Sequence, residues 1–189
     1  TVLTLMALYL ADGRNGEHKA LMRELEAIPD KIESIIKRGK DIEALASKYM
    51  KYGSALFLGR GFNYPVALEG ALKLKEISYI HAEGYSAGEM KHGPIALITP
   101  DFPTVAIAPK NSMFEKMASS IQEIKARGGK VFAIGTEGDT EIGELADDVF
   151  FVPKTLEPLE PFLTVVPLQL FAYLVGTKKM FNVDKPRNL

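Results

Sequence analysis

Residues 55–80 have the sequence ALFLGRGFNYPVALEGALKLKEISYI, and this stretch decides the fold class. It begins with a short apolar run, continues through a glycine-bounded turn and enters a helical pattern. Asn63 is a suitable cap for that helix, and Pro65 fits its first turn. A buried strand that turns directly into a helix is the repeating unit of parallel α/β sheets.

The rest of the chain repeats this alternation. Three more apolar runs, rich in β-branched and aromatic side chains, occupy residues 104–108, 131–134 and 149–152. None of them alternates cleanly, which is typical of strands buried on both faces. Helices are predicted over residues 112–126, 141–146 and 159–181. The sequence therefore predicts an α/β fold whose parallel sheet has right-handed crossovers.

Residues 1–51 differ in character from the rest. An apolar run at 2–11 precedes a turn-like segment at 12–16, and two amphipathic helices follow within 21–39 and 42–49. We interpret residues 1–51 as a helical arm and residues 52–189 as the main domain. Because the chain starts at Thr1 within an apolar run, we expect it to be part of a longer protein.

Composition narrows the classes of function. The chain has 189 residues, a formal net charge of -1 and no cysteine. Near-neutral charge gives no indication of a nucleic-acid or anionic-membrane partner, and the apolar run at 2–11 is about half of a spanning helix. Lack of cysteine excludes disulfides and thiolate chemistry and is consistent with the cytoplasm. Three scattered histidines without ligand spacing argue against a zinc site.

The turn Gly59-Arg60-Gly61 is a candidate anion site, because it follows a strand and opens a helix. A dinucleotide fingerprint would need glycine at position 64, where the chain has Tyr64, and no P-loop lysine follows. Two interpretations stay open: a turn that binds phosphate or sugar, and a tight turn with Arg60 on the surface.

The predicted helix carries a narrow charged strip of Glu69, Lys73 and Glu76, which lie within about 60° of one another at about 100° per residue. Apolar residues flank the strip, with Leu68, Leu72 and Tyr79 on one side and Val66 and Ile77 on the other. The strip is either an ordinary Glu69–Lys73 ion pair or the wall of a cleft or interface. In a cleft, Glu76 can move a proton between adjacent carbons while Lys73 stabilises the developing oxyanion.

His92 stands in the predicted loop Lys91-His92-Gly93-Pro94. A single histidine is more often structural than catalytic. Held by glycine and proline in a loop, however, its ring can exchange protons near neutral pH, as the opening of a sugar ring requires.

Several motifs in order resemble the second sugar-isomerase (SIS) domain of the glutamine–fructose-6-phosphate aminotransferase family. They are LGRG at 58–61, LEGALKLKEI at 68–77, KHGP at 91–94, VVPLQL at 165–170 and PRNL at 186–189. The resemblance covers residues 52–189 densely. It is weaker over residues 1–51, which resemble the end of the first SIS domain and the connector.

The resemblance implies a three-layer sandwich with a five-stranded parallel sheet between helices. It implies that Glu76 is the base that moves a proton between C1 and C2 of fructose 6-phosphate, with Lys73 and Glu69 as its helix partners. His92 matches a ring-opening histidine that reaches the active site of the other subunit in a homodimer. No metal or organic cofactor is implied. The implied partners are a glutaminase domain and a first SIS domain of the same protein.

Two parts of the family pattern are missing from this sequence. They are a phosphate loop rich in serine and threonine, upstream of Thr1, and a tail beyond Leu189 that carries an imine-forming lysine. We therefore expect little or no aminotransferase activity from this chain alone. The alternatives are an SIS-type aminosugar-phosphate deaminase and a sugar-phosphate-binding regulatory module, although residues 1–51 contain no helix-turn-helix pattern.

Overall fold

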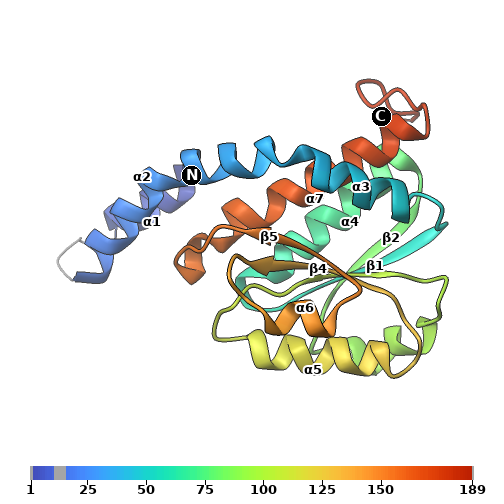
Figure 1. Cartoon of the computed structure of the whole chain (residues 1–189). Helices are drawn as coiled ribbons and strands as arrows, with labels where there is room; N and C mark the ends of the chain where they lie inside the picture. The colour runs from blue at the N-terminus through green and yellow to red at the C-terminus, as the bar shows by residue number, and fades with distance from the viewer. Residues whose placement is uncertain (1, 11–15, 189) are drawn as a thin grey trace.

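A five-stranded parallel sheet forms the centre of the structure, a computed structural model that describes residues 2–10 and 16–188 (Figure 1). The spatial order is β2-β1-β3-β4-β5. The strands are β1 (Ser54–Gly59), β2 (His81–Ser86), β3 (Thr104–Ile107), β4 (Val131–Thr136) and β5 (Asp148–Val152). The four strands predicted from apolar runs, and the parallel sheet, are confirmed.

The edge strand β2 was implied only by the family resemblance, because its own sequence, HAEGYS, is polar. It pairs with β1 from Ser54↔His81 to Gly59↔Ser86. Ala82 is the one residue of this strand that is fully buried, so the strand needs no continuous apolar run. Gly84 is the residue of this strand that indicates close packing. A methyl group there would lie 2.8 Å from the Cα atom of Leu68, so the helix Tyr64–Ser78 packs directly on the strand.

Helices cover both faces of the sheet and make three layers (Figure 1). One face carries α2 (Gly16–Lys37), α3 (Gly39–Tyr49), α4 (Tyr64–Ser78) and α7 (Glu160–Lys178), and the other carries α5 (Phe114–Lys125) and α6 (Glu141–Leu145). Short 3-10 turns complete the connections: η1 (Gly61–Asn63), η2 (Met90–His92), η3 (Pro94–Leu97) and η4 (Glu157–Leu159).

Each strand serves two hydrophobic cores, because successive side chains point to opposite faces. Phe57 and Phe132 are fully buried beneath α4 and α7, whereas Leu56 and Ala133 are fully buried on the side of α5 and α6. Burial on both faces is the physical reason why β1, β3 and β4 lack alternation and why their unbroken apolar runs predicted them.

The segment 157–178, which includes α7, is long and apolar enough to cross a membrane. Its apolar character has another explanation in this fold. Leu163, Leu168 and Val175 are fully buried against the sheet and its neighbouring helices. α7 is thus a core helix of the domain.

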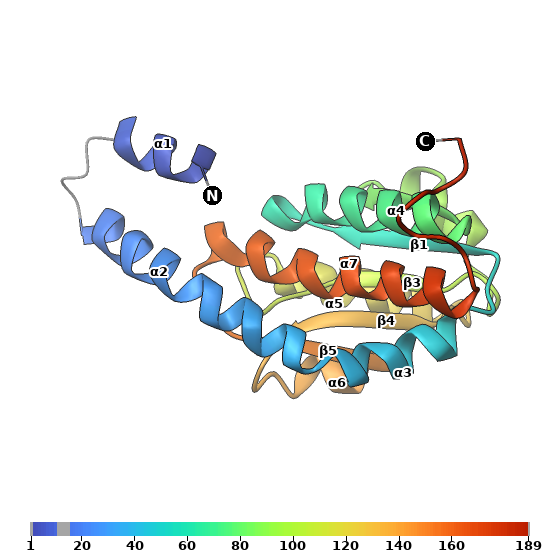
Figure 2. The same cartoon turned by 90° about the horizontal axis from the view of Figure 1, so that it is seen from above.

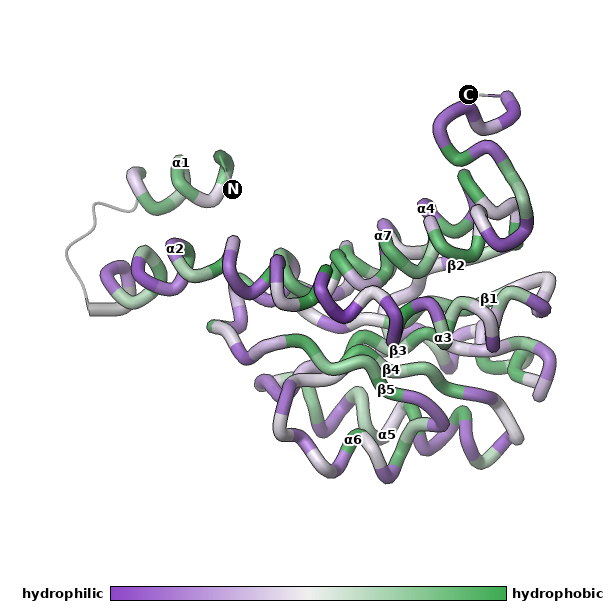
Figure 3. Tube along the Cα trace, turned by 45° about the horizontal axis from the view of Figure 1, so that its top comes forward, coloured by the Kyte–Doolittle hydropathy of each residue, from purple (hydrophilic) through white to green (hydrophobic). Residues whose placement is uncertain are grey.

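The N-terminal arm is helical, as predicted. α2 and α3 lie along α7, with Ile35 and Ile42 fully buried (Figure 2). α1 (Val2–Leu10) is mostly hydrophobic along its length (Figure 3), yet none of its residues is buried. Leu3 is 80% exposed and Tyr9 85% exposed. The predicted turn at 12–16 falls mainly outside the described residues, and the division of the chain at residue 51 stays a prediction.

Candidate active site

The charged strip lies on α4, which begins at Tyr64 with Pro65 in its first turn and ends before Tyr79. Tyr79 closes the helix in the left-handed conformation, with φ of 57°. Asn63 occupies the cap position, but its side chain makes no capping hydrogen bond, so that part of the prediction is wrong. The Asn63 amide bonds instead to residues of α7, as described below.

Lys73 and Glu76 form the closest pair of the strip. The Lys73 Nζ donates to Glu76 Oε2 at 2.6 Å, with 34% and 27% of the two side chains exposed. This hydrogen bond, aided by the charge of Glu69, raises the pKa of the Lys73 ammonium although partial burial opposes it. Glu69 bonds elsewhere, because its Oε1 accepts from Gln169 Nε2 at 3.3 Å. Lys73 therefore pairs with Glu76 and not with Glu69, the partner that i,i+4 spacing favours.

An exposed apolar ridge runs beside the strip. Leu68 and Leu72 are each 42% exposed, and Tyr64, one turn earlier, is 37% exposed. On the other side of the strip, Val66 is buried. The predicted apolar shoulders thus differ: one belongs to the core and the other faces outward, which is the arrangement expected of an interface.

A depression of about 430 Å³ lies at the C-terminal end of α4. Its lining includes Glu76, Tyr79 and Arg187. The Arg187 backbone N–H donates to Tyr79 Oη at 3.0 Å, and the Arg187 guanidinium carbon lies 4.1 Å from the centre of the Tyr79 ring. Sequence reasoning gave Tyr79 only a flanking role. Tyr79 binds the C-terminal segment from a left-handed backbone conformation at the end of α4, which helical periodicity does not predict.

The turn that carries His92 is anchored on the opposite side of the sheet from the strip. His92 ends η2, whose Met90 is buried in the core under α5 and α6, whereas α4 belongs to the other face. The His92 side chain is 74% exposed, and its Nε2 is 4.0 Å from Glu89 Oε2. The depression that contains Glu76 does not include His92. Within one copy of the chain, the structure does not bring these two predicted residues together.

The turn Gly59-Arg60-Gly61 has a conformational explanation. A methyl group at Gly59 would fall inside the Asn63 carbonyl, and Gly61 has φ of 53°. Arg60 is partly buried, and its Nη2 lies 3.5 Å from Ser120 Oγ on α5. Anion binding by this turn stays a prediction.

A buried carboxylate, Glu160, fills the crevice between the turns that follow β1 and β3. Open α/β sheets generally bind ligands at this point, where the strand order reverses. Glu160 Oε2 accepts from Asn63 Nδ2 at 2.8 Å and from Asn111 Nδ2 at 2.6 Å, and Thr164 Oγ1 donates to Asn63 Oδ1 at 2.7 Å. The protein's own side chain therefore occupies the crevice, and sequence reasoning did not anticipate it.

Glu160 gives a pH-dependent prediction. Burial raises the pKa of its carboxyl, although the hydrogen bonds from Asn111 and Asn63 act in the opposite direction. A raised pKa in the folded state means that the unfolded chain loses this proton first as pH rises above about 4.3. We expect wild type to gain stability relative to Glu160→Gln as pH falls from about 7 to about 4. Urea unfolding at both pH values checks this, with exposed Glu144→Gln as control. A difference independent of pH would contradict it.

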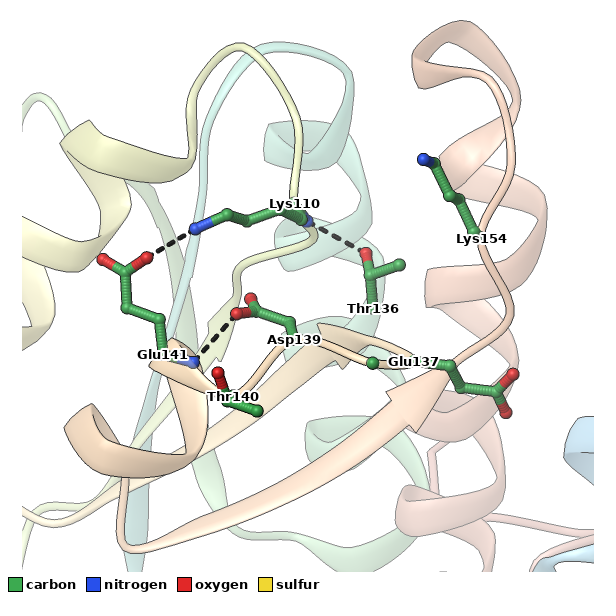
Figure 4. A pocket seen from close by; sticks show the side chains of 8 residues that line it. Lys110, Thr136, Glu137, Asp139, Thr140, Glu141 and Lys154 are labelled. Atoms are coloured by element: carbon green, nitrogen blue, oxygen red, sulfur yellow. Dashed lines mark hydrogen bonds and ion pairs between the residues drawn. The ribbon is translucent and has the colours of Figure 1, made fainter.

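A second depression, of about 350 Å³, opens at the carboxyl ends of β4 and β5 (Figure 4). Lys110 Nζ donates to Glu141 Oε2 at 2.5 Å, and Asp139 Oδ1 accepts from the Glu141 backbone N–H at 3.0 Å. None of the predicted site residues lines it. Among residues 2–10 and 16–188 no group of three or more histidine, aspartate or glutamate side chains is arranged to hold a metal ion.

The sheet with helices on both faces defines a doubly wound α/β domain. The family model described as SIS domain matches residues 48–177, so the chain belongs to the SIS domain family. It is 52% identical, over 98% of its length, to the glutamine–fructose-6-phosphate aminotransferase [isomerizing] of Aquifex aeolicus. It is 51% identical to the protein of the same name from Chlorobaculum tepidum. The chain spans 31% of the length of each of these relatives.

Solved structures agree on the fold. The C-terminal domain of glucosamine-fructose-6-phosphate aminotransferase from Francisella tularensis matches with a TM-score of 0.89 and 34% identity, over 97% of this chain and 53% of that one. Glucosamine-6-phosphate deaminase from Thermotoga maritima matches with a TM-score of 0.71 and 25% identity, over 97% of this chain and 51% of that one. The three-layer SIS fold is confirmed.

Proposed function

We propose that this chain is part of the isomerase portion of a glutamine–fructose-6-phosphate aminotransferase, which makes glucosamine 6-phosphate. The observation that carries the proposal is the 52% identity over nearly the whole chain to a relative of that name. The alternative deaminase function has weaker support, because the deaminase structure is 25% identical. Residues 1–51 are then the end of a first SIS domain and the connector, and residues 52–189 belong to the second.

The geometry of α4 supports a role for Glu76 as the base. Ammonia condenses with the C2 carbonyl of fructose 6-phosphate and water leaves. Glu76 then takes a proton from C1 and returns it to C2, which leaves the aldehyde at C1 and the amine at C2. Lys73, 2.6 Å from Glu76, supplies positive charge beside the oxygen that becomes anionic, and Glu69 supports the strip. We expect no metal or organic cofactor in this reaction.

The positions of Glu76 and His92 support a site shared between copies. Because Glu76 and the turn that carries His92 are anchored on opposite faces of the sheet, His92 is expected to open the sugar ring in the active site of a second subunit. The exposed ridge of Tyr64, Leu68 and Leu72 is consistent with further protein covering α4. The proposed assembly is a cytoplasmic homodimer whose subunits each also contain a glutaminase domain and a first SIS domain.

The test uses the full-length protein that contains this chain, with fructose 6-phosphate and glutamine as substrates. We expect glucosamine 6-phosphate and glutamate as products, and no product above background from residues 1–189 alone. Full-length protein that instead only converts glucosamine 6-phosphate to fructose 6-phosphate and ammonia, without using glutamine, would establish the deaminase. Binding of sugar phosphate without turnover would establish the regulatory module.

A further inference from the structure

Arg60 carries the side chain of the predicted turn Gly59-Arg60-Gly61, and this side chain has no role in the site described above. Its Nε is buried without a hydrogen-bond partner, and its Nη2 is 3.5 Å from Ser120 Oγ. Among the described ranges, 2–10 and 16–188, no carboxylate pairs with this guanidinium within 4.0 Å. A partly buried arginine without an acidic partner calls for an explanation, because removing its charge from water has a cost.

The guanidinium lies against the loop that carries His92. A methyl group added at Gly88 would be 3.3 Å from Arg60 Nη1 and 3.9 Å from Arg60 Cζ. The guanidinium therefore lies beside Gly88, within reach of the position that a side chain there would occupy. A larger residue here would displace the guanidinium by a few tenths of an ångström, which favours glycine at a position where φ alone does not require it.

The preceding residue of the same turn holds the same loop. Ala87 N–H donates to the Gly59 carbonyl at 3.0 Å, and Glu89 N–H donates to the Ser86 carbonyl at 2.8 Å. His92 N–H in turn donates to the Glu89 carbonyl at 3.0 Å. A continuous series of short contacts thus connects the turn after β1 to the backbone of His92.

The far side of the loop is fixed to α5. Lys91 Nζ pairs with Glu123 Oε1 at 2.9 Å, and Met90 is buried against the α5 side of the sheet. Arg60 lies between the two, because its Nη2 is 3.5 Å from Ser120 Oγ on the same helix and its Nη1 lies beside Gly88 in the loop. The His92 side chain is 74% exposed and its Nε2 lies 4.0 Å from Oε2 of the exposed Glu89, so the loop backbone is what sets the position of the ring.

We propose that Arg60 is a positioning residue: its guanidinium supports the loop of residues 87–93 and thereby fixes His92 for the neighbouring active site. This inference rests on the proposed function of His92. It differs from the interpretation of Arg60 as a ligand for phosphate, since Nη2 lies near Ser120 of α5 and Nη1 lies near Gly88 of the loop. Planar shape, rather than positive charge alone, matters here, because one flat group touches two elements at once.

The test compares Arg60→Met and Arg60→Lys in the full-length enzyme. We expect kcat for glucosamine 6-phosphate formation to fall roughly 10- to 100-fold in both variants, because small displacements of a catalytic group cost that much. The KM for fructose 6-phosphate and the rate of glutamine hydrolysis are expected to stay near wild type. Arg127→Met, which removes an exposed arginine of the same helix layer, is the control and is expected to be neutral.

A double-mutant cycle with His92→Asn separates positioning from general damage to the fold. If Arg60 acts through His92, Arg60→Met causes little further loss once His92 is absent. Gly88→Ala, which pushes the guanidinium away but keeps its charge, is expected to reproduce part of the loss. Additive effects in the cycle would overturn the proposal. So would a raised KM with unchanged kcat in Arg60→Met, together with recovery in Arg60→Lys.

Amide hydrogen exchange gives a measurement that does not depend on turnover. In Arg60→Met we expect faster exchange at Ala87, Glu89 and His92, with exchange in β4 unchanged. Unchanged exchange in the loop would overturn the proposal. If wild-type full-length protein forms no glucosamine 6-phosphate, the proposed function fails, and exchange in the loop then decides by itself whether Arg60 holds it.

Discussion

Glu76→Gln in the full-length protein is expected to abolish formation of glucosamine 6-phosphate while glutamine hydrolysis continues. Glutamine has the size of glutamate, and its amide oxygen can still accept from Lys73 Nζ, so the helix and its 2.6 Å contact need not change. What is lost is a group that takes and returns a proton. Removal of a general base typically costs roughly 10²- to 10⁴-fold in rate.

The measurement is the rate of glucosamine 6-phosphate formation beside the rate of glutamate release, in the same preparation. Glu115→Gln, an exposed glutamate on α5 and far from the strip, is the matched control and should behave as wild type. A Glu76→Gln enzyme that retains more than a small fraction of its isomerising activity would show that another residue is the base.

Gly59→Ala is expected to cause the largest loss of stability among single methyl additions in this domain. The added methyl group would overlap the Asn63 carbonyl, which is backbone and cannot move aside without unwinding the start of α4. Overpacking against a fixed backbone costs about 3 kcal/mol or more in unfolding free energy. The same strain would shift the Gly59 carbonyl that accepts from Ala87.

Urea unfolding of residues 1–189 checks this prediction. The control is Gly143→Ala, because nothing lies within 4 Å of a methyl group there and the residue is inside α6. Alanine in a helix interior is favoured over glycine by about 1 kcal/mol, so this variant should unfold at an equal or higher urea concentration. Equal midpoints for Gly59→Ala and wild type would contradict the steric account of the turn.

The sequence predicted most of the fold because its signals are local. Four strands stand out as unbroken apolar runs: β1, β3 and β4 are buried on both faces, and β5 is buried on one face and partly buried on the other. Helical spacing placed Glu69, Lys73 and Glu76 on one strip of α4, and the structure keeps them there. β2 escaped detection, because only Ala82 in it is fully buried and its sequence has neither apolar continuity nor alternation.

Within the candidate site, spacing determined which residues share a face but not which partners they take. Lys73 pairs with Glu76, Asn63 bonds to Glu160 instead of capping α4, and Arg60 turns inward beneath Gly88. Each of the last two contacts joins residues far apart in the chain or on different elements. A buried polar group needs a hydrogen-bond partner. Which groups become buried, and which partners lie near them, is known only when the layers are assembled.

The sequence by itself determined the α/β class, the charged strip on α4 and the family, because periodicity and the order of motifs are properties of the linear sequence. Only the tertiary structure decided that Glu160 closes the crevice at the strand-order reversal and that Glu76 and the turn of His92 are anchored on opposite faces of the sheet. The physical reason is that the two faces of the sheet are covered by different helices: Glu76 lies on α4 on one face, and the loop of His92 is anchored by buried Met90 in the core of the other face.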